Sequence, residues 1–418
     1  MKRSFSDIMA GLDSERAQKV ARKLPAWAAV DAARRAAGLD PLEFPGALSL
    51  EQCSSSATAL YKAHLAGQAA AAANLRFAHP SHAFRRGPLP FTRPWVATGL
   101  PAAPPDPAEE EEKIGVVLDL TGGLGVDSWA FSQVAERVVY FEQNAELAAA
   151  AARNFAKLGA DNIEVRNETV TPETELPEAD LIYADPARRS AAGRKVFLLE
   201  DCTPDILTLL PMLLRKAPVV LLKLSPMADL AMLAGRLGPT LREIHVVESD
   251  GEVKELLCLL VRDSAPAEPQ IIIAAQPEPE NAFCFRATEE RAAEAVYAAG
   301  VQAGDTLLEP CPALLKAGAF KLPCARWSLL KLAPSTHLYL GEAAPFFKAW
   351  HVAEVLPFGA AAFRQLKRSY PRAEVTARNL PLGSDALRKK LGVAPGGDVH
   401  IFGCRLADGR AVLLVCTR

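Results

Sequence analysis

The central part of the chain alternates short apolar runs with segments whose apolar residues recur at helical spacing. The apolar runs predict seven strands: Val116–Leu120, Val138–Phe141, Asn162–Arg166, Asp180–Ala184, Pro218–Pro226, Leu241–Glu248 and Lys254–Val261. Helical segments separate most of these runs, whereas Ser249-Asp250-Gly251 between the last two is typical of a hairpin turn. This order predicts an α/β domain over 114–263, with a seven-stranded sheet whose ligands bind at the carboxyl ends of its strands.

The region before this domain follows a different pattern. Residues 1–97 contain Ala-rich stretches with apolar residues at helical spacing, such as Ala26–Ala37 and Ser54–Ala73, and they predict an N-terminal helical region. Residues 98–113 are rich in proline and then in glutamate, which predicts an exposed linker.

Beyond a proline-containing connector over 264–280, the chain predicts two small α+β domains, a ferredoxin-like one at 281–345 and a basic one at 359–418. The whole chain has a net charge of −2, yet residues 359–418 hold eleven Lys and Arg against four acids. This excess predicts a basic surface that binds the phosphates of a nucleic acid. The alternative is a solvated face on a structural domain.

Composition narrows the class of protein further. A chain of 418 residues, half of them hydrophobic, is long enough for about two to four domains. Its eight cysteines include no C-x-x-C pair, so we expect neither a disulfide framework nor a metal site. Charges interrupt the first fifteen residues, and no apolar run approaches the length of a membrane span. We therefore expect a cytoplasmic protein without a membrane segment.

The first predicted strand leads into a glycine-rich turn, Val116 to Asp127, read as VVLDLTGGLGVD. Glycine lets a backbone turn sharply and approach a ligand closely, but the spacing does not match the dinucleotide fingerprint G-x-G-x-x-G. The spacing D-x-T-G-G-x-G-x-D instead resembles the first motif of class I S-adenosylmethionine-dependent methyltransferases. The resemblance implies that the turn passes under the methionine and ribose of the cofactor, with contacts from Asp119, Thr121, Gly122, Gly123, Gly125 and Asp127. An ordinary strand-to-helix turn with a capping aspartate is the alternative.

Two further acids follow the second and third predicted strands. Glu142 ends the second strand, where a carboxylate can accept hydrogen bonds from both ribose hydroxyls. Glu168 stands where such methyltransferases recognise adenine, although it could equally be a solvated loop acid. The resemblance extends over residues 114–263, because a Rossmann-like sheet of seven strands with its last strand inserted antiparallel is typical of this class.

The fourth predicted strand delivers Asp185-Pro186-Ala187-Arg188 to the carboxyl edge of the sheet. This segment resembles the D-P-P-x motif by which many nucleic-acid methyltransferases hold a base amino group. The resemblance assigns Asp185 and Pro186 to the target base and leaves Arg188 to orient the substrate. A simple Asp-Pro turn is the alternative.

Two departures from the motif limit what it implies. The aromatic residue that often follows the prolines is missing, since Ala187 and Arg188 stand there. Uracil C5 methyltransferases attack with a cysteine after strand five, where this chain has Lys223-Leu224-Ser225-Pro226, so covalent C5 chemistry is not expected. The cluster of Arg188, Arg189, Arg194 and Lys195 suits phosphate contacts near a target base, or is merely solvated.

The C-terminal segments AEVTARNLPLGSDALRKKLG and DVHIFGCRLADGRAVLLVCTR resemble the THUMP-like domain that follows the methyltransferase core in a bacterial family. EQCSSSATALYKA, YADPARR and KLSPM also resemble that family, so the match covers most of the chain. True THUMP domains bind structured RNA, which by analogy makes tRNA or rRNA the expected partner.

The leading hypothesis is an S-adenosylmethionine-dependent methyltransferase that modifies a base nitrogen in RNA. A small-molecule or protein methyltransferase is the rival enzyme class, for which the basic tail would be incidental. A non-catalytic RNA-binding protein that retains the methyltransferase fold is the third hypothesis.

Overall fold

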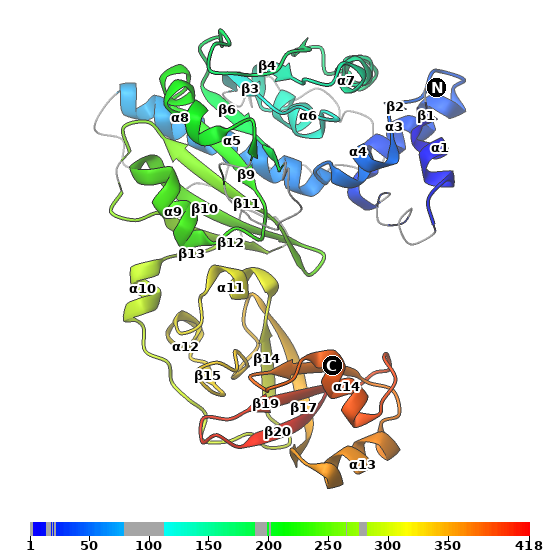
Figure 1. Cartoon of the computed structure of the whole chain (residues 1–418), viewed down its shortest axis with the longest axis vertical. Helices are drawn as coiled ribbons and strands as arrows, with labels where there is room; N and C mark the ends of the chain where they lie inside the picture. The colour runs from blue at the N-terminus through cyan, green and yellow to red at the C-terminus, as the bar shows by residue number, and fades with distance from the viewer. Residues whose placement is uncertain are drawn as a thin grey trace, which may run out of the picture. The chain divides into compact units, whose positions relative to one another are not determined.

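The computed structural model describes residues 3–13, 18, 20, 22–78, 113–188, 199, 202–264, 266–275 and 282–418. It divides into two compact units (Figure 1). The first comprises Met1–Ser249 with Lys254–Ala282, and the second comprises Asp250–Val253 with Phe283–Arg418. Apart from Lys113, the predicted linker over 98–113 lies outside the described residues.

A mixed sheet in the order β13-β12-β10-β11-β9-β6-β3-β4-β5 forms the centre of the first unit. Its strands are β3 (Ile114–Asp119), β4 (Ala135–Phe141), β5 (Ile163–Arg166), β6 (Leu181–Ala184), β9 (Val219–Leu224), β10 (Leu241–Ser249), β11 (Glu252–Val261), β12 (Gln270–Ala275) and β13 (Ala282–Arg286). The strands from β9 to β5 in this order are parallel, and β11 runs antiparallel to β9. Asp250 and Gly251 both have positive φ, which fits a tight hairpin turn between β10 and β11. The predicted α/β fold class is confirmed.

The sheet is wider than the seven strands that the sequence predicts. It has two additional strands, of which β13 begins at Ala282, in the segment that the pattern assigns to the first small domain. The other, β12, comes from the sequence QIIIAA, inside the segment 264–280 that the pattern assigns to a connector. β12 pairs in parallel with β10, and its three isoleucines are buried. The segment forms a strand because it pairs with β10. The prolines near it in the sequence made the pattern indicate a connector instead.

Helices cover both faces of this sheet, with α5 crossing behind the strands and with α8 and α9 in front of them (Figure 1). The helices are α1 (Phe5–Ala10), α3 (Pro25–Ala36), α4 (Ala47–Gln52), α5 (Ser56–Ala78), α6 (Val126–Ser132), α7 (Ala145–Lys157), α8 (Ile206–Lys216) and α9 (Leu230–Leu237), with the 3₁₀ turn η2 (Gly238–Thr240). The short strands β1 (Arg3–Ser4), β2 (Glu43–Phe44), β7 (Ala187–Arg188) and β8 (Cys202–Thr203) form two small pairs outside the main sheet. None of the helices in the described ranges combines the length and the apolar character needed to cross a membrane.

The N-terminal helices share one hydrophobic core with the sheet. The ring of Trp27 on α3, which is fully buried, packs edge-on against Trp129 of α6 with 6.3 Å between centroids. Asn154 of α7 forms two hydrogen bonds of 2.7 Å with the main chain of Glu43, as a strand partner would. The described part of the N-terminal region therefore stabilises the sheet directly by burial of apolar area.

The second unit contains a seven-stranded sheet in the order β15-β16-β14-β17-β20-β19-β18. Its strands are β14 (Thr306–Pro310), β15 (Leu330–Lys331), β16 (Tyr339–Leu340), β17 (Phe347–Pro357), β18 (Glu374–Arg378), β19 (His400–Arg405) and β20 (Ala411–Thr417). The helices are α10 (Ala287–Ala292), α11 (Pro312–Ala317), α12 (Leu322–Trp327), α13 (Ala360–Ser369) and α14 (Ser384–Leu391).

A single long strand joins the two small domains that the sequence predicts. β17 lies in the interval between residues 345 and 359, which the pattern assigns to neither domain. Its first residues pair with β14 and its later residues pair with β20, with a register shift between Val352 and Glu354. The two C-terminal segments thus share one continuous sheet.

Candidate active site

The glycine turn between β3 and α6 lies closely over two aromatic rings. A Cβ added at Gly122 would lie 2.0 Å from the Tyr140 ring, and one at Gly125 would lie 2.4 Å from the Phe155 ring. Gly123 and Gly125 also have φ of 56° and 85°, in the left-handed region. A Cβ at Gly123 would have no heavy atom beyond its chain neighbours closer than 3.9 Å. Packing inside the protein thus requires Gly122 and Gly125, whereas Gly123 leaves open space beside the turn.

Glu142 follows β4 and lies against this turn. Its Oε2 accepts a hydrogen bond from the Gly123 main-chain N–H at 2.9 Å, and its Oε1 accepts one from Asn144 at 2.7 Å. The Asn167 side chain donates to the Glu142 main-chain oxygen at 2.7 Å. Each carboxylate oxygen has further acceptor capacity, so Glu142 can also accept from the hydroxyls of a ligand. Glu168 is exposed beside Asn167, and its contact with adenine stays a prediction.

Asp185 follows β6 and is tied to the glycine turn through its main chain. Its N–H donates to Thr121 Oγ1 at 2.6 Å, and its carboxylate forms an ion pair with the Lys223 ammonium at the end of β9. Burial lowers the pKa of Lys223, but the nearby carboxylates, Asp185 first among them, outweigh this effect and hold the pKa above its ordinary value. Asp185 thus shares its carboxylate with a charged lysine, a partner that the sequence analysis did not identify.

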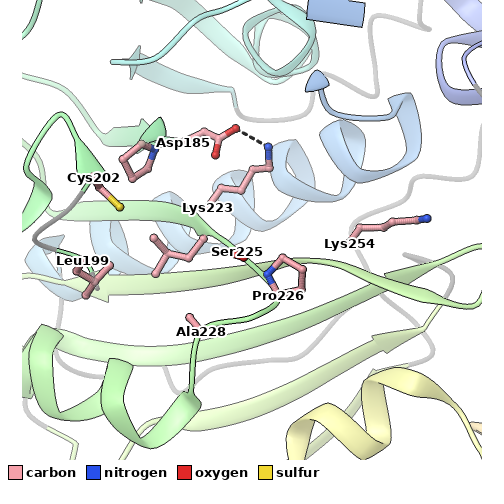
Figure 2. Close-up of a pocket in the computed structure, with 10 residues that line it drawn as sticks. Asp185, Leu199, Cys202, Lys223, Ser225, Pro226, Ala228 and Lys254 are labelled. Carbon is pink, nitrogen blue, oxygen red and sulfur yellow. Dashed lines mark hydrogen bonds and ion pairs between the residues drawn. The ribbon is translucent and has the colours of Figure 1, made fainter. Parts of the chain in front are cut away.

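A pocket of about 170 Å³ opens beside this ion pair (Figure 2). Figure 2 shows the side chains of Asp185 and Lys223 pointing toward each other at its edge. The pocket is lined by Asp185, Pro186, Leu199, Cys202, Lys223, Leu224, Ser225, Pro226, Ala228 and Lys254. Cys202 therefore brings a thiol to the site from β8, although the segment directly after strand five, Leu224-Ser225-Pro226, contains no cysteine. Among the described residues, no group of three His, Cys, Asp or Glu is placed to hold a metal ion.

The basic cluster after Asp185 is only partly described. Arg188 pairs with Cys202 in the short ladder of β7 and β8, which places its main chain next to the pocket. The Arg188 side chain, together with Arg189, Arg194 and Lys195, lies outside the described residues. The predicted role of Arg188 in orienting the substrate stays a prediction.

Asp119 supports the glycine turn from inside the protein. The residue is fully buried, and its carboxylate accepts hydrogen bonds from Thr121 N–H at 3.1 Å and from Ser128 Oγ at 2.5 Å. Burial raises its pKa to about 7, against the lowering effect of these hydrogen bonds. In this arrangement Asp119 joins the turn to α6, and a direct contact with a cofactor stays a prediction.

Asp127, in the first turn of α6, is surrounded by polar partners. Its Oδ2 accepts from Ser54 Oγ at 2.8 Å and from the Tyr183 hydroxyl at 2.9 Å, and its Oδ1 lies 3.1 Å from Lys62 Nζ. Burial raises the pKa of Asp127, but Lys62 and Lys223 outweigh it, so the pKa lies below the ordinary value. The carboxylate predicted to meet the cofactor is thus ionised and already paired.

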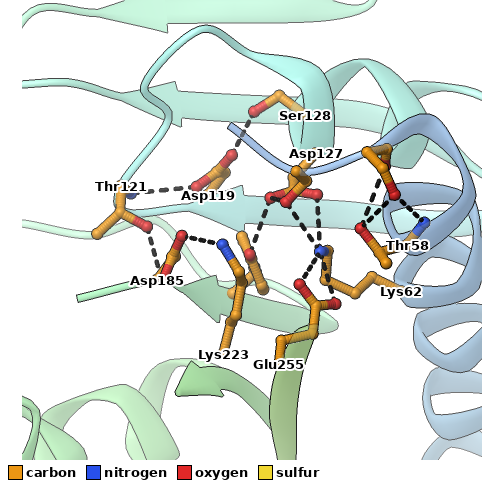
Figure 3. A network of polar contacts seen from close by, with 12 residues as sticks. Thr58, Lys62, Asp119, Thr121, Asp127, Ser128, Asp185, Lys223 and Glu255 are labelled. Carbon is orange, nitrogen blue, oxygen red and sulfur yellow. Dashed lines mark hydrogen bonds and ion pairs between the residues drawn. The ribbon is translucent and has the colours of Figure 1, made fainter. Parts of the chain in front are cut away.

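Lys62 projects from α5 into the protein and forms the centre of a polar network (Figure 3). Its side chain is fully buried, and its Nζ lies 3.0 and 3.1 Å from the two oxygens of Glu255 on β11. It also donates to Ser54 Oγ at 3.0 Å. Burial raises the pKa of Glu255, which Lys62 and Lys223 offset only in part. The network thus connects α5, the glycine turn and β11.

Four members of the site were not predicted from the sequence: Lys62, Ser54, Glu255 and Lys223. Lys62 and Ser54 belong to EQCSSSATALYKA, a segment that the sequence links to a family without assigning it a role. The available signal was a lysine inside an Ala-rich helical segment. If that helix packs in the core, the lysine needs a partner, because lysine is almost never fully buried without one. The partner Glu255 stands 193 residues further along the chain, beyond the reach of local pattern.

Two family models match the second unit. A ferredoxin-like domain model matches residues 307–346, and a THUMP domain-like model matches residues 347–418. No curated protein matches the chain.

Solved structures resemble the chain over its whole length or over a part of it. The crystal structure of a protein named a putative methyltransferase from Porphyromonas gingivalis W83 is 31% identical, with a TM-score of 0.70 over 100% of this chain and 94% of that one. An rRNA methylase from Streptococcus thermophilus is 13% identical, with a TM-score of 0.27 over 36% of this chain and 88% of its own. A Streptococcus mutans protein in complex with SAH is 10% identical, with a TM-score of 0.27 over 36% and 90%.

Replacing Lys62 by methionine should destabilise the first unit by about 3–5 kcal/mol, because Glu255 and Asp127 would lose a buried counter-charge. Differential scanning calorimetry of the full chain measures this loss. The control is Lys216→Met, which removes an ion pair with Glu178 whose side chains are 35% and 77% exposed; it should cost less than about 1 kcal/mol. Equal losses of stability in the two variants would contradict the proposed contribution of the buried network to the stability of the first unit.

The Asp119→Asn variant should change how stability depends on pH. Since the folded pKa of about 7 lies above the ordinary 3.8, the folded wild type binds the extra proton between these values, and its stability falls as pH rises through that window. The variant lacks this titration, so the wild type should lose stability relative to it by on the order of 1 kcal/mol for each pH unit from 4 to 7. Urea unfolding at several pH values measures the difference, and parallel curves would rule out the raised pKa.

Proposed function

The chain belongs to the class I methyltransferase family that has a C-terminal THUMP-like domain, and from this membership we propose that it is an S-adenosylmethionine-dependent methyltransferase acting on a base nitrogen of tRNA or rRNA. One observation carries the proposal. The hydrogen bond from Asp185 N–H to Thr121 Oγ1 joins the predicted acceptor loop to the glycine turn at one edge of the sheet. A methyl donor at the turn and a base at Asp185 would therefore be neighbours, as direct transfer requires.

Two features of the turn support binding of the cofactor, namely hydrogen-bond acceptors and open space. Glu142 offers acceptor oxygens for a ribose diol, and Gly123 leaves room beside the backbone. Asp127 and Asp185 are each paired with a lysine, so the cofactor proposal rests on Glu142 and the glycine turn and not on the net charge of this edge. S-adenosylmethionine would supply a methyl group on a sulfonium, while Asp119, Thr121, Gly122, Gly125 and Glu168 complete the proposed set of cofactor residues.

RNA as the substrate is supported by the surface of the second unit. The α13–α14 surface consists of five exposed basic residues: Arg364, Lys367, Arg368, Lys389 and Lys390. Lys390 Nζ also lies 5.6 Å from the Phe358 ring centroid and 5.5 Å from that of Phe363. Arg378 and Arg410 pair instead with Glu309 and Asp408, so the basic surface is narrower than the charge count of residues 359–418 indicates. Basic groups beside aromatic rings are typical of surfaces that bind RNA.

Calorimetry with S-adenosylmethionine tests the cofactor. The Glu142→Ala variant should weaken binding by about 1.5–3 kcal/mol, because a charged acceptor is lost from the turn. Glu136→Ala removes an exposed acid from β4 as a matched control and should leave the affinity unchanged. If the wild type binds S-adenosylmethionine no better than NAD, the proposed function is wrong.

Salt-dependent RNA binding tests the α13–α14 surface. The triple variant Arg364→Gln, Lys367→Gln, Lys389→Gln should lower the slope of log affinity against log salt by about 2, since each lost phosphate contact removes roughly 0.7–0.9. Filter binding with total RNA from a strain lacking the gene measures the slope.

The control for this experiment is Arg410→Gln, because Arg410 Nε lies 2.6 Å from Asp408 and is already paired. It should leave the slope unchanged. Superimposable curves for the triple variant and the wild type would reject RNA recruitment by this surface and favour a small-molecule or protein substrate.

A further inference from the structure

The ion pair at the edge of the pocket has a donor and an acceptor side by side. We propose that Lys223 contacts the substrate and that Asp185 and Lys223 together select a lactam edge, the ring N–H and adjacent carbonyl of guanine or uracil, over the amino groups of adenine and cytosine. This inference rests on the proposed function and narrows its substrate class.

The sheet places the two side chains together. β6 and β9 are parallel neighbours with Ala184 opposite Leu222, so Asp185 and Lys223 leave adjacent strands at the same edge. Both residues line the pocket, together with the apolar walls of Pro186 and Pro226. A carboxylate next to an ammonium complements an N–H next to a C=O, since the carboxylate only accepts hydrogen bonds and the ammonium only donates them.

Lys223 has donor capacity to spare. An ammonium has three N–H donors, and within the described part of the chain the side-chain hydrogen bond of Lys223 goes to Asp185 alone. Its side chain remains 14% exposed at the pocket. A carbonyl oxygen of a bound base can therefore take a second N–H without breaking the pair with Asp185.

Charge distinguishes the two classes of methyl acceptor, amino groups and lactams. Carboxylates at Asp185, Glu255 and Asp127 keep Lys223 protonated, so it acts as a fixed positive charge and not as a base. An amino nitrogen becomes positive as it gains a methyl group, which a neighbouring ammonium opposes. A lactam becomes negative on its oxygen as the ring N–H is lost, which the same ammonium stabilises.

The transfer step balances with these two residues and a sulfonium methyl donor. Asp185 accepts the proton of the ring N–H, while Lys223 donates to the carbonyl oxygen on which negative charge develops. The ring nitrogen then forms the new bond to the methyl carbon as the carbon–sulfur bond breaks, and that electron pair stays on sulfur. Asp185 afterwards releases its proton to solvent.

Nucleoside analysis of the wild-type reaction tests the proposal first. The protein is incubated with isotopically labelled S-adenosylmethionine and total RNA from a strain lacking the gene, and the digested nucleosides are identified by mass spectrometry. Label in 1-methylguanosine or 3-methyluridine is the expected result. Label on the amino group of adenosine or cytidine overturns the lactam assignment, and label at a pyrimidine C5 overturns it in favour of the Cys202 thiol. Absence of label from every RNA refutes the proposed function itself.

Variants of Lys223 test its contact with the substrate. Lys223→Met should lower kcat by about 10²–10³-fold, as expected for the loss of an oxyanion donor, while calorimetric affinity for S-adenosylhomocysteine stays the same. Alkaline pH should restore part of this rate, because the lactam then loses its proton without help. Lys223→Arg should retain more activity than Lys223→Met, and Lys216→Met on α8 should behave as wild type. Loss of S-adenosylhomocysteine binding without recovery at alkaline pH would assign Lys223 a structural role and overturn the proposal.

Discussion

The fully buried ammonium of Lys62 is the constraint on which the first unit depends. Removing such a charge from water costs several kcal/mol, and only well-placed carboxylates offset that cost. Asp127 at the glycine turn and Glu255 on β11 supply them from separate parts of the fold. α5, the turn and β11 must therefore meet in one arrangement, because a shift of any of them would leave a buried charge without its partner.

The same charges extend to the proposed acceptor side of the site. The pKa of Lys223 is raised by its direct partner Asp185 and also by Glu255 and Asp127. Thr121 adds a mechanical link, since its hydroxyl accepts from Asp185 while its own N–H donates to Asp119. The parts of the molecule proposed to hold cofactor and base are thus joined by one set of charges and hydrogen bonds.

Local pattern in the sequence was enough to predict the α/β class, the glycine turn and the place of Asp185 at a strand end, because each depends on residues close in the chain. It missed β12, whose isoleucines become a strand only through pairing with β10. It missed β17, which belongs to both C-terminal segments. The roles of Lys62 and Lys223 were not predicted for the same reason, since they depend on carboxylates that only the fold brings near. Whether the predicted cofactor residues bind a cofactor depends on a ligand, which neither pattern nor packing supplies.

The anchoring of α5 also has a consequence for the order in which the chain can fold. Its Tyr61 hydroxyl lies 2.7 Å from His245 Nδ1, 184 residues later, and Lys62 reaches Glu255, 193 residues later. During synthesis this helix emerges well before either partner, and closing such long loops delays its docking. Until β10 and β11 leave the ribosome, Tyr61 and Lys62 lack these partners, so α5 reaches its final position only after most of the first unit has been synthesised.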